Sequence, residues 1–195
     1  MAGYDEVLNF WFSGELLGKE QMNRWWQKDK QVDEWIKKRF ETLVDNIYQG
    51  LYKNWSQTPK GCLAAIICLD QFPRNMYRGD LKAFEYDALA LSLVQKGLEL
   101  EYELALNDLE RTFFILPLMH HENTESQVLC LQLYEQLAQN AEDEVKSYLS
   151  RTVIFAKKHL EIIERFGRFP HRNKVLGREC TEEEIEFLTR PGSSF

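Results

Sequence analysis

Three short segments gather side chains that could bind a ligand or transfer a proton. Residues 70–78 read Asp-Gln-Phe-Pro-Arg-Asn-Met-Tyr-Arg, and residues 120–122 read His-His-Glu. Residues 165–178 read Arg-Phe-Gly-Arg-Phe-Pro-His-Arg-Asn-Lys-Val-Leu-Gly-Arg and contain no acidic residue. Guanidinium groups bind carboxylates and phosphates through paired hydrogen bonds. Several arginines converging on one concave end of the fold would therefore form a pocket for a small anion.

The candidate ligand-binding residues share a charged or hydrogen-bonding side chain within these segments: Asp70, Arg74, Asn75, Arg78, His120, Glu122, Arg165, Arg168, His171, Arg172, Asn173 and Arg178. His120 or His171 could act as a general acid or base. A carboxylate, Asp70 or Glu122, would then fix the tautomer of the imidazole. No nucleophile with a recognisable base is evident, so catalysis is the weaker interpretation of these residues.

A metal site built from Asp70, His120, Glu122 and His171 is chemically admissible but disfavoured. His120 and Glu122 are two residues apart, a spacing that brings both to one ion only in extended or loop backbone. The neighbouring arginines would also repel a cation. We therefore expect neither a metal nor another cofactor.

The same charges have a structural interpretation, which the sequence favours over a ligand site. Arginines at helix ends commonly bond exposed carbonyl groups and pair with carboxylates of neighbouring helices. Asp70 with Arg172, or Glu122 with Arg74, could simply connect two helices. Convergence of the three segments in a cleft would favour a ligand site, whereas dispersal would favour structural ion pairs.

Helices must position these segments, because apolar residues recur at three- and four-residue intervals along the chain. The predicted helices span 4–12, 29–50, 58–72, 81–100, 107–117, 126–138, 142–166 and a short stretch from 181. Three of them open on capping signatures: Thr58-Pro59, Asn107 with Glu110, and Thr181 with Glu184. Two are expected to end at prolines, at Phe72-Pro73 and Leu116-Pro117. Residues 13–28 are predicted to form a connector, and His159 to face solvent.

No stretch alternates with period two for long enough to predict a strand, so the fold class is all-α. With 195 residues the chain is most simply a single domain, residues 1–195. Paired helices of these lengths would stack as antiparallel hairpins, the architecture of an α-α superhelix. Each of the three polar segments follows an apolar helical run, so all three could line one end of such a stack.

Composition limits the partners and the compartment. The formal net charge of −7 argues against nucleic acid and against an anionic membrane surface. The longest apolar run is far too short to span a bilayer, and the N-terminal sequence has acids where a signal peptide carries positive charge. The cysteines, at positions 62, 68, 130 and 180, have no C-x-x-C spacing and are expected as free thiols. We expect a cytoplasmic protein.

The chain resembles a known family, domain-of-unknown-function family 924. The resemblance rests on Asp-Gln-Phe-Pro-Arg-Asn at 70–75, Leu-Pro-Leu-Met-His-His-Glu at 116–122 and Arg-Phe-Gly-Arg-Phe-Pro-His-Arg-Asn at 165–173. It covers nearly the whole chain, with His121 standing where the family pattern has serine. The resemblance implies a protein of mostly bacterial occurrence. It also implies a tetratricopeptide-like fold, a stack of antiparallel helix hairpins. It implies no activity.

Two functions from different classes remain open. The first is binding of a small anionic ligand or acidic peptide by the arginine and histidine cluster. The second is a protein-interaction scaffold in which that cluster is purely structural. Aromatic residues in connectors are the candidate anchors of a scaffold: Trp25, Trp26, Tyr52 and Trp55. An enzymatic activity is uncertain and is the less favoured expectation.

Overall fold

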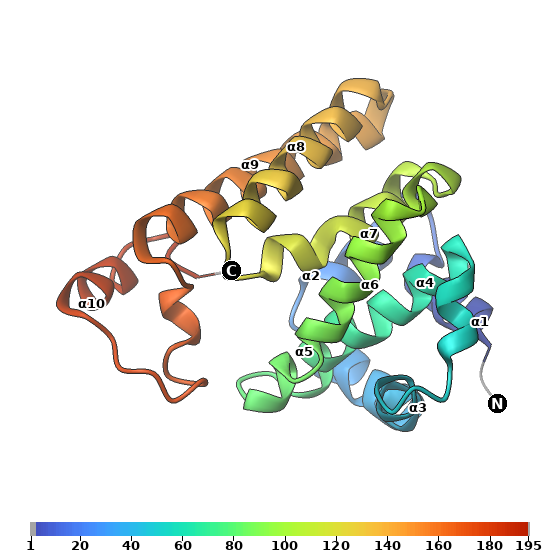
Figure 1. Cartoon of the computed structure of the whole chain (residues 1–195), viewed down its shortest axis with the longest axis horizontal. Coiled ribbons are helices and arrows are strands. Elements are labelled where there is room, and N and C mark those ends of the chain that lie inside the picture. Colours follow the sequence, from blue (N-terminus) through green and yellow to red (C-terminus); the bar gives the residue numbers. More distant parts are fainter. Residues whose placement is uncertain (1–2, 195) are drawn as a thin grey trace.

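The computed structural model describes residues 3–194, and of Asp143 only the backbone. This part of the chain is helical and contains no strand (Figure 1). The α-helices are α1 (Tyr4–Phe12), α2 (Lys19–Trp26), α3 (Lys30–Tyr48), α4 (Pro59–Ile66), α5 (Phe72–Met76), α6 (Asp87–Glu99), α7 (Asp108–His120), α8 (Thr124–Asn140), α9 (Asp143–Phe166) and α10 (Glu182–Leu188). The shorter turns are η1 (Lys53–Gln57), η2 (Ile67–Gln71), η3 (Leu81–Phe84), η4 (Tyr102–Ala105) and η5 (Pro170–Arg172).

The centre of the molecule is formed by α4, η2 and α7, whose residues are buried almost without interruption. Helices α1, α6 and α7 pack on α4, and α3 packs on α5. Edge-to-face aromatic contacts lock this centre: the Trp11 ring lies 5.7 Å from Phe72 and 5.5 Å from Phe113 between centroids. The predicted central position of the apolar run after Pro59 is therefore correct.

The helix that begins at Pro59 does not end at Phe72-Pro73, so that prediction is wrong. It passes through a π-helical segment, η2, and continues as α5 to Met76. The Phe72 N–H bonds the carbonyl of Ile67, five residues back. Pro73 has no N–H to donate, and the helix accommodates it directly after this wider π turn. The same turn contains Asp70.

The predicted end at Leu116-Pro117 is also wrong. Helix α7 continues past Pro117 to His120. The fully buried amide of Gln127 on α8 bonds the carbonyls of Leu118, Met119 and His121, with Nε2–O distances of 3.3, 2.7 and 2.8 Å. A neighbouring helix thus satisfies the carbonyl groups that the end of α7 exposes.

Two further boundaries differ from expectation. Residues 19–26 form α2 within the predicted connector, because the Trp25 indole N–H donates to the Trp11 carbonyl at 2.8 Å and holds the segment on α1. The helix expected over 81–100 begins as the 3₁₀ turn η3, and α6 proper starts at Asp87. The capping signatures at Thr58, Asn107 and Thr181 are all confirmed.

Helices α8 and α9 form a long antiparallel pair beside the bundle of α1–α7 (Figure 1). Helix α9 ends at Gly167, whose φ of +68° is the left-handed conformation that glycine adopts easily. The chain then crosses back through η5, and α10 packs against it. His159 on α9 is buried, at 6% exposure, so the prediction that it faces solvent is wrong. None of the helices described here is long and apolar enough to cross a membrane.

Candidate functional site

Asp70 and His120 meet where η2 passes the C-terminal end of α7. The His120 Nδ1 atom lies 2.7 Å from Asp70 Oδ1, and Asp70 is 1% exposed. The amide of Gln71 donates to the second carboxylate oxygen. We call this unit the Asp70–His120 pair, and it is one of the four histidine–carboxylate combinations that the sequence left open.

Electrostatics assign the protonation states of the pair. Burial raises the pKa of the Asp70 carboxyl, but the charge of Arg74 and the hydrogen bonds from His120 and Gln71 outweigh it and hold that pKa well below its usual range. Burial and the charge of Arg74 lower the pKa of His120. At neutral pH the carboxylate is therefore ionised and the imidazole neutral. The Nδ1–H donates to Asp70, and the unprotonated nitrogen of His120 is Nε2.

The guanidinium of Arg74 is bonded to two carboxylates, so a ligand could not use all of its donors. Its Nη1 and Nη2 atoms donate to Asp87 Oδ1 and Oδ2 at 2.8 and 2.9 Å. Nη1 also lies 3.3 Å from Asp70 Oδ1 and bonds the Asp70 carbonyl at 2.6 Å. Burial lowers and the two acids raise the pKa of Arg74, and the acids prevail.

Arg172 reaches the same place from η5 but finds no carboxylate. The proposed Asp70–Arg172 ion pair is wrong, since among the described residues no acid lies within ion-pair distance of Arg172. Its Nη1 donates to the carbonyl of His120 at 2.8 Å, whereas its buried Nε has no acceptor. The guanidinium lies 4.5 Å from the Phe169 ring centroid and 5.2 Å from that of Phe84. Burial, reinforced by the charge of Arg74, lowers its pKa to about 10.

Glu122 closes one side of this region and pairs with Arg178, not with Arg74 as expected. Arg178 Nη1 and Nη2 donate to the two carboxylate oxygens at 2.5 and 2.9 Å. The backbone N–H of Phe169 donates to Glu122 Oε1 at 2.8 Å. Burial raises and these donors lower the pKa of Glu122, with a net decrease. The second and third polar segments are thus joined by a structural ion pair.

The remaining residues of the third segment turn toward α10. Arg168 forms a two-point pair with Glu184, with its Nε and Nη2 at 2.6 and 2.8 Å from the carboxylate oxygens. The Asn173 amide also reaches Glu184, at 3.2 Å. The hydrogen bond from Arg168 and those from the Thr181 backbone and Asn173 outweigh burial and lower the pKa of Glu184 to about 2. Arg165 pairs with Glu183 on the surface.

Asn75 and Arg78 bind α3 and not the Asp70–His120 pair. Both donate to Asp33, Asn75 at 2.8 Å and Arg78 at 2.6 and 2.8 Å. They connect α3 to the segment after α5 and take no part in the arrangement around Arg172. The three segments therefore converge only in part, at Asp70, Arg74, His120 and Arg172.

The other two histidines near this region are neutral. Burial first, and then neighbouring positive charge, lowers the pKa of His159 to about 3 and that of His171 to about 4. The ring of Phe169 lies between them, 5.4 Å from His159 and 5.7 Å from His171 between centroids. The described side chains include no group of three His, Cys, Asp or Glu residues arranged to hold a metal ion.

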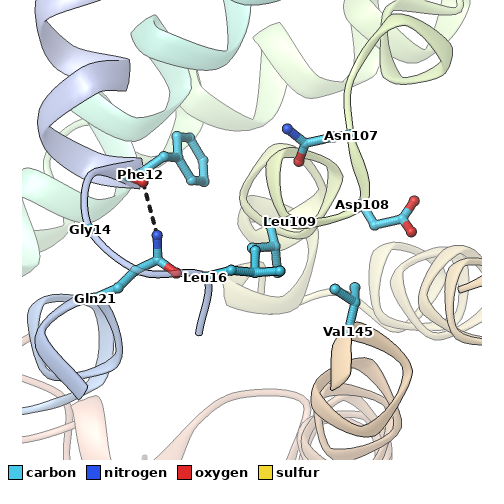
Figure 2. A pocket seen from close by; sticks show the side chains of 8 residues that line it. All are labelled: Phe12, Gly14, Leu16, Gln21, Asn107, Asp108, Leu109 and Val145. Carbon is cyan, nitrogen blue, oxygen red and sulfur yellow. Dashed lines mark hydrogen bonds between the residues drawn. The ribbon is translucent and has the colours of Figure 1, made fainter. Parts of the chain in front are cut away.

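Two cavities in the described part of the chain lie elsewhere. One, of about 320 Å³, lies between the end of α1 and the start of α7; its lining residues are Phe12, Gly14, Leu16, Gln21, Asn107, Asp108, Leu109 and Val145 (Figure 2). The amide of Gln21 is already bonded to the carbonyl of Phe12 there (Figure 2). The second, of about 510 Å³, includes Lys60 and Glu110. Neither contains a residue of the three segments.

The sequence did not reveal the carboxylates that pair with the arginines, and these determine which arginine stays available to a ligand. Asp33, Asp87 and Glu184 neutralise three of them, and each acid lies on a helix where it resembles a solvated surface residue. The capping signature at Thr181 was the one local signal, because it includes Glu184. Phe84, which stacks on Arg172, belongs to a short 3₁₀ turn with no signal of its own.

The fold and the site define a small all-helical protein with a buried histidine–carboxylate pair beside a partly unpaired arginine. The chain belongs to the family described as bacterial protein of unknown function (DUF924), whose model matches residues 7–192. A similar solved structure is the protein of unknown function ATU0120 from Agrobacterium tumefaciens, with 30% sequence identity and a TM-score of 0.80. The similarity covers 95% of this chain and 96% of that one. No curated protein matches the chain.

Proposed function

We propose that the chain binds a small anion at Arg172, beside the Asp70–His120 pair. The observation that carries this proposal is the environment of Arg172: 8% exposed, with a buried Nε that has no acceptor and no carboxylate within ion-pair distance in the described chain. A buried cation without an anion is costly, and a bound anion would offset that cost. We call Arg172 and His120 together the Arg172 site.

The arginines with carboxylate partners reduce the candidate ligand-binding residues to a smaller set. Arg74, Arg78, Arg165, Arg168 and Arg178 each have a carboxylate partner. These five arginines of the predicted cluster therefore fit the structural interpretation. The rings of Phe84 and Phe169 hold the guanidinium of Arg172 in place, so the ligand need not order it. A single cation without a carboxylate partner favours a small anion over an acidic peptide, which would need several charged contacts.

Within this proposal the domain is a tetratricopeptide-like stack of antiparallel hairpins, with the site where α5, α7 and η5 meet. The adjacent, antiparallel α8 and α9 support that architecture. We place the activity in the cytoplasm, because Cys62, Cys68 and Cys130 are buried free thiols.

One observation supports the scaffold interpretation, the exposure of Trp26. Of its proposed anchors, Trp26 is 43% exposed and stacks on Phe113 with ring centroids 5.7 Å apart. Trp25 and Trp55 are buried in the core and are not free to bind a partner. A single exposed indole is a smaller basis for a function than the unpaired cation at Arg172.

Thermal or urea unfolding with and without inorganic phosphate, at fixed ionic strength, tests the proposal. Phosphate should stabilise the wild type, by about 2.7 kcal/mol at a hundredfold excess over its dissociation constant. Arg172→Gln should abolish this effect. It should also change the free energy of unfolding without phosphate by only about 1 kcal/mol, since the His120 carbonyl loses one donor but no carboxylate loses a partner.

Arg165→Gln is the matched control, because Arg165 carries the same charge in the same segment but pairs with Glu183 on the surface. This variant should retain the full phosphate effect. A wild type indifferent to phosphate, or an Arg172→Gln variant stabilised as much as the wild type, would overturn the proposal.

A further inference from the structure

Two polar atoms of the Arg172 site have no partner in the described chain and keep contact with solvent. Arg172 Nη1 is bonded to the His120 carbonyl and Nε is closed off, but Nη2 makes no hydrogen bond and is not among the fully buried atoms. The same holds for His120 Nε2, since Nδ1 is the nitrogen committed to Asp70. The open atoms are thus one donor with positive charge and one acceptor.

The two atoms belong to side chains that meet at the C-terminal end of α7. The guanidinium bonds the backbone of the residue that bears the imidazole, and the charge of Arg172 acts on His120. Nη2 can only donate, so it selects an anionic oxygen. Nε2 can only accept while Asp70 holds Nδ1–H, so it selects a group that carries a proton.

We propose that the ligand of the Arg172 site is a small carboxylate that also bears a hydroxyl group, such as a 2-hydroxy acid. Its carboxylate binds Arg172 Nη2, and its hydroxyl donates to His120 Nε2. This inference rests on the proposed anion binding and names the class of ligand. A carboxylate without the hydroxyl leaves Nε2 unpaired when it displaces water, and a buried unpaired acceptor lowers affinity.

Binding of lactate and of propionate, measured by titration calorimetry at fixed ionic strength, tests this inference. The two anions differ only in the hydroxyl group. We expect the wild type to bind both, with lactate about tenfold tighter, a factor that corresponds to one hydrogen bond.

His120→Asn is the informative variant, because asparagine places an amide N–H near the position of Nδ1 and has nothing at the position of Nε2. It should lose the preference for lactate over propionate. His121→Asn is its matched control, since His121 bonds Ser126 and not Asp70, and it should keep the preference.

The outcomes separate the two proposals. Equal affinity of the wild type for lactate and propionate would overturn the hydroxy-acid inference and leave anion binding intact. Failure of the wild type to bind either carboxylate would overturn the hydroxy-acid inference, and would overturn both proposals if the wild type is also indifferent to phosphate. If His120→Asn does not fold, the comparison of the two ligands on the wild type still decides the inference.

Discussion

Asp70 is the side chain on which the site depends most. It is buried, bonds His120 and Gln71, and lies in ion-pair contact with Arg74. An ionised acid at such a position is stable only while its partners remain, and the partners in turn depend on it. The residue therefore fixes both the charge of Arg74 and the tautomer of His120.

Asp70→Ala should lower the free energy of unfolding by about 3–5 kcal/mol, because it leaves buried donors of His120 and Gln71 without an acceptor. Urea unfolding at pH 7 measures the change. Glu183→Ala is the control, since its pair with Arg165 is exposed and should contribute at most about 1 kcal/mol. A loss below about 1 kcal/mol in Asp70→Ala would show that the acid is solvated.

The buried histidines make stability depend on pH below neutrality. An unfolded histidine has a pKa of about 6.5, whereas burial lowers that of folded His159 to about 3. As pH falls from 6.5 to about 4, the unfolded chain binds protons that the folded chain does not. The free energy of unfolding should therefore decrease, by up to about 1.4 kcal/mol per pH unit for each such histidine.

His159→Asn tests the share of that one residue. It removes the titrating ring and keeps an amide N–H for the Phe155 carbonyl that His159 Nδ1 now contacts. Urea unfolding between pH 7 and 4.5 should show a shallower decline in the variant. An unchanged slope would mean that His159 is protonated in the folded protein.

At the scale of elements, the positions of the site residues come from helices that continue through proline. Asp70 lies on a π turn before Pro73, and His120 lies one turn after Pro117. The carbonyl groups at the end of α7 that have no donor within the helix accept hydrogen bonds from Gln127 and Arg172. The end of α7 thus depends on side chains from two other elements.

Gln127→Ala should therefore cost about 2–3 kcal/mol, since it removes the donor to three carbonyls in the interior. It should also weaken the phosphate effect by displacing His120. Gln132→Ala, at an exposed position of the same helix, should change neither quantity. Full stability of Gln127→Ala would show that water replaces the amide without cost.

What the sequence predicts well is local, and what it predicts poorly depends on distant neighbours. Capping at Thr58, Asn107 and Thr181 involves residues three positions apart, so each was readable in the chain. The proline boundaries were wrong because a π turn precedes Pro73, and because a side chain of α8 bonds the carbonyl groups at the end of α7, beyond Pro117. The site was predicted as a set of residue types, but its division into paired and unpaired arginines depends on acids of α3, α6 and α10.

At the scale of the whole molecule, the buried apolar side chains of residues 3–194 form two clusters of unequal size. The large one extends from α1 to α9, and the small one consists of Ile162, Ile163 and Phe169 with Phe166 and Phe187 against it. Helix α10 belongs to the small cluster and is joined to the rest by the Arg168–Glu184 pair. We propose that the chain nevertheless folds as one domain.

Native-state hydrogen exchange should reflect this inequality. Amides of α10 should exchange faster than those of α4, because less apolar surface is buried around them. Phosphate should slow exchange in the segment 165–178, which carries Arg172, without affecting η1. Equal protection of α10 and α4 would mean that the two clusters open together.

The most direct measurement of the central claim follows the Arg172 guanidinium itself. Its buried Nε–H has no acceptor, so it should give a distinct signal in an ¹H–¹⁵N spectrum. Titration with inorganic phosphate should shift the Arg172 Nε and His120 ring signals, and leave the Arg168 Nε signal, which is bonded to Glu184, unchanged. A titration that leaves the Arg172 signal in place, or that shifts all arginine signals alike, would contradict the site.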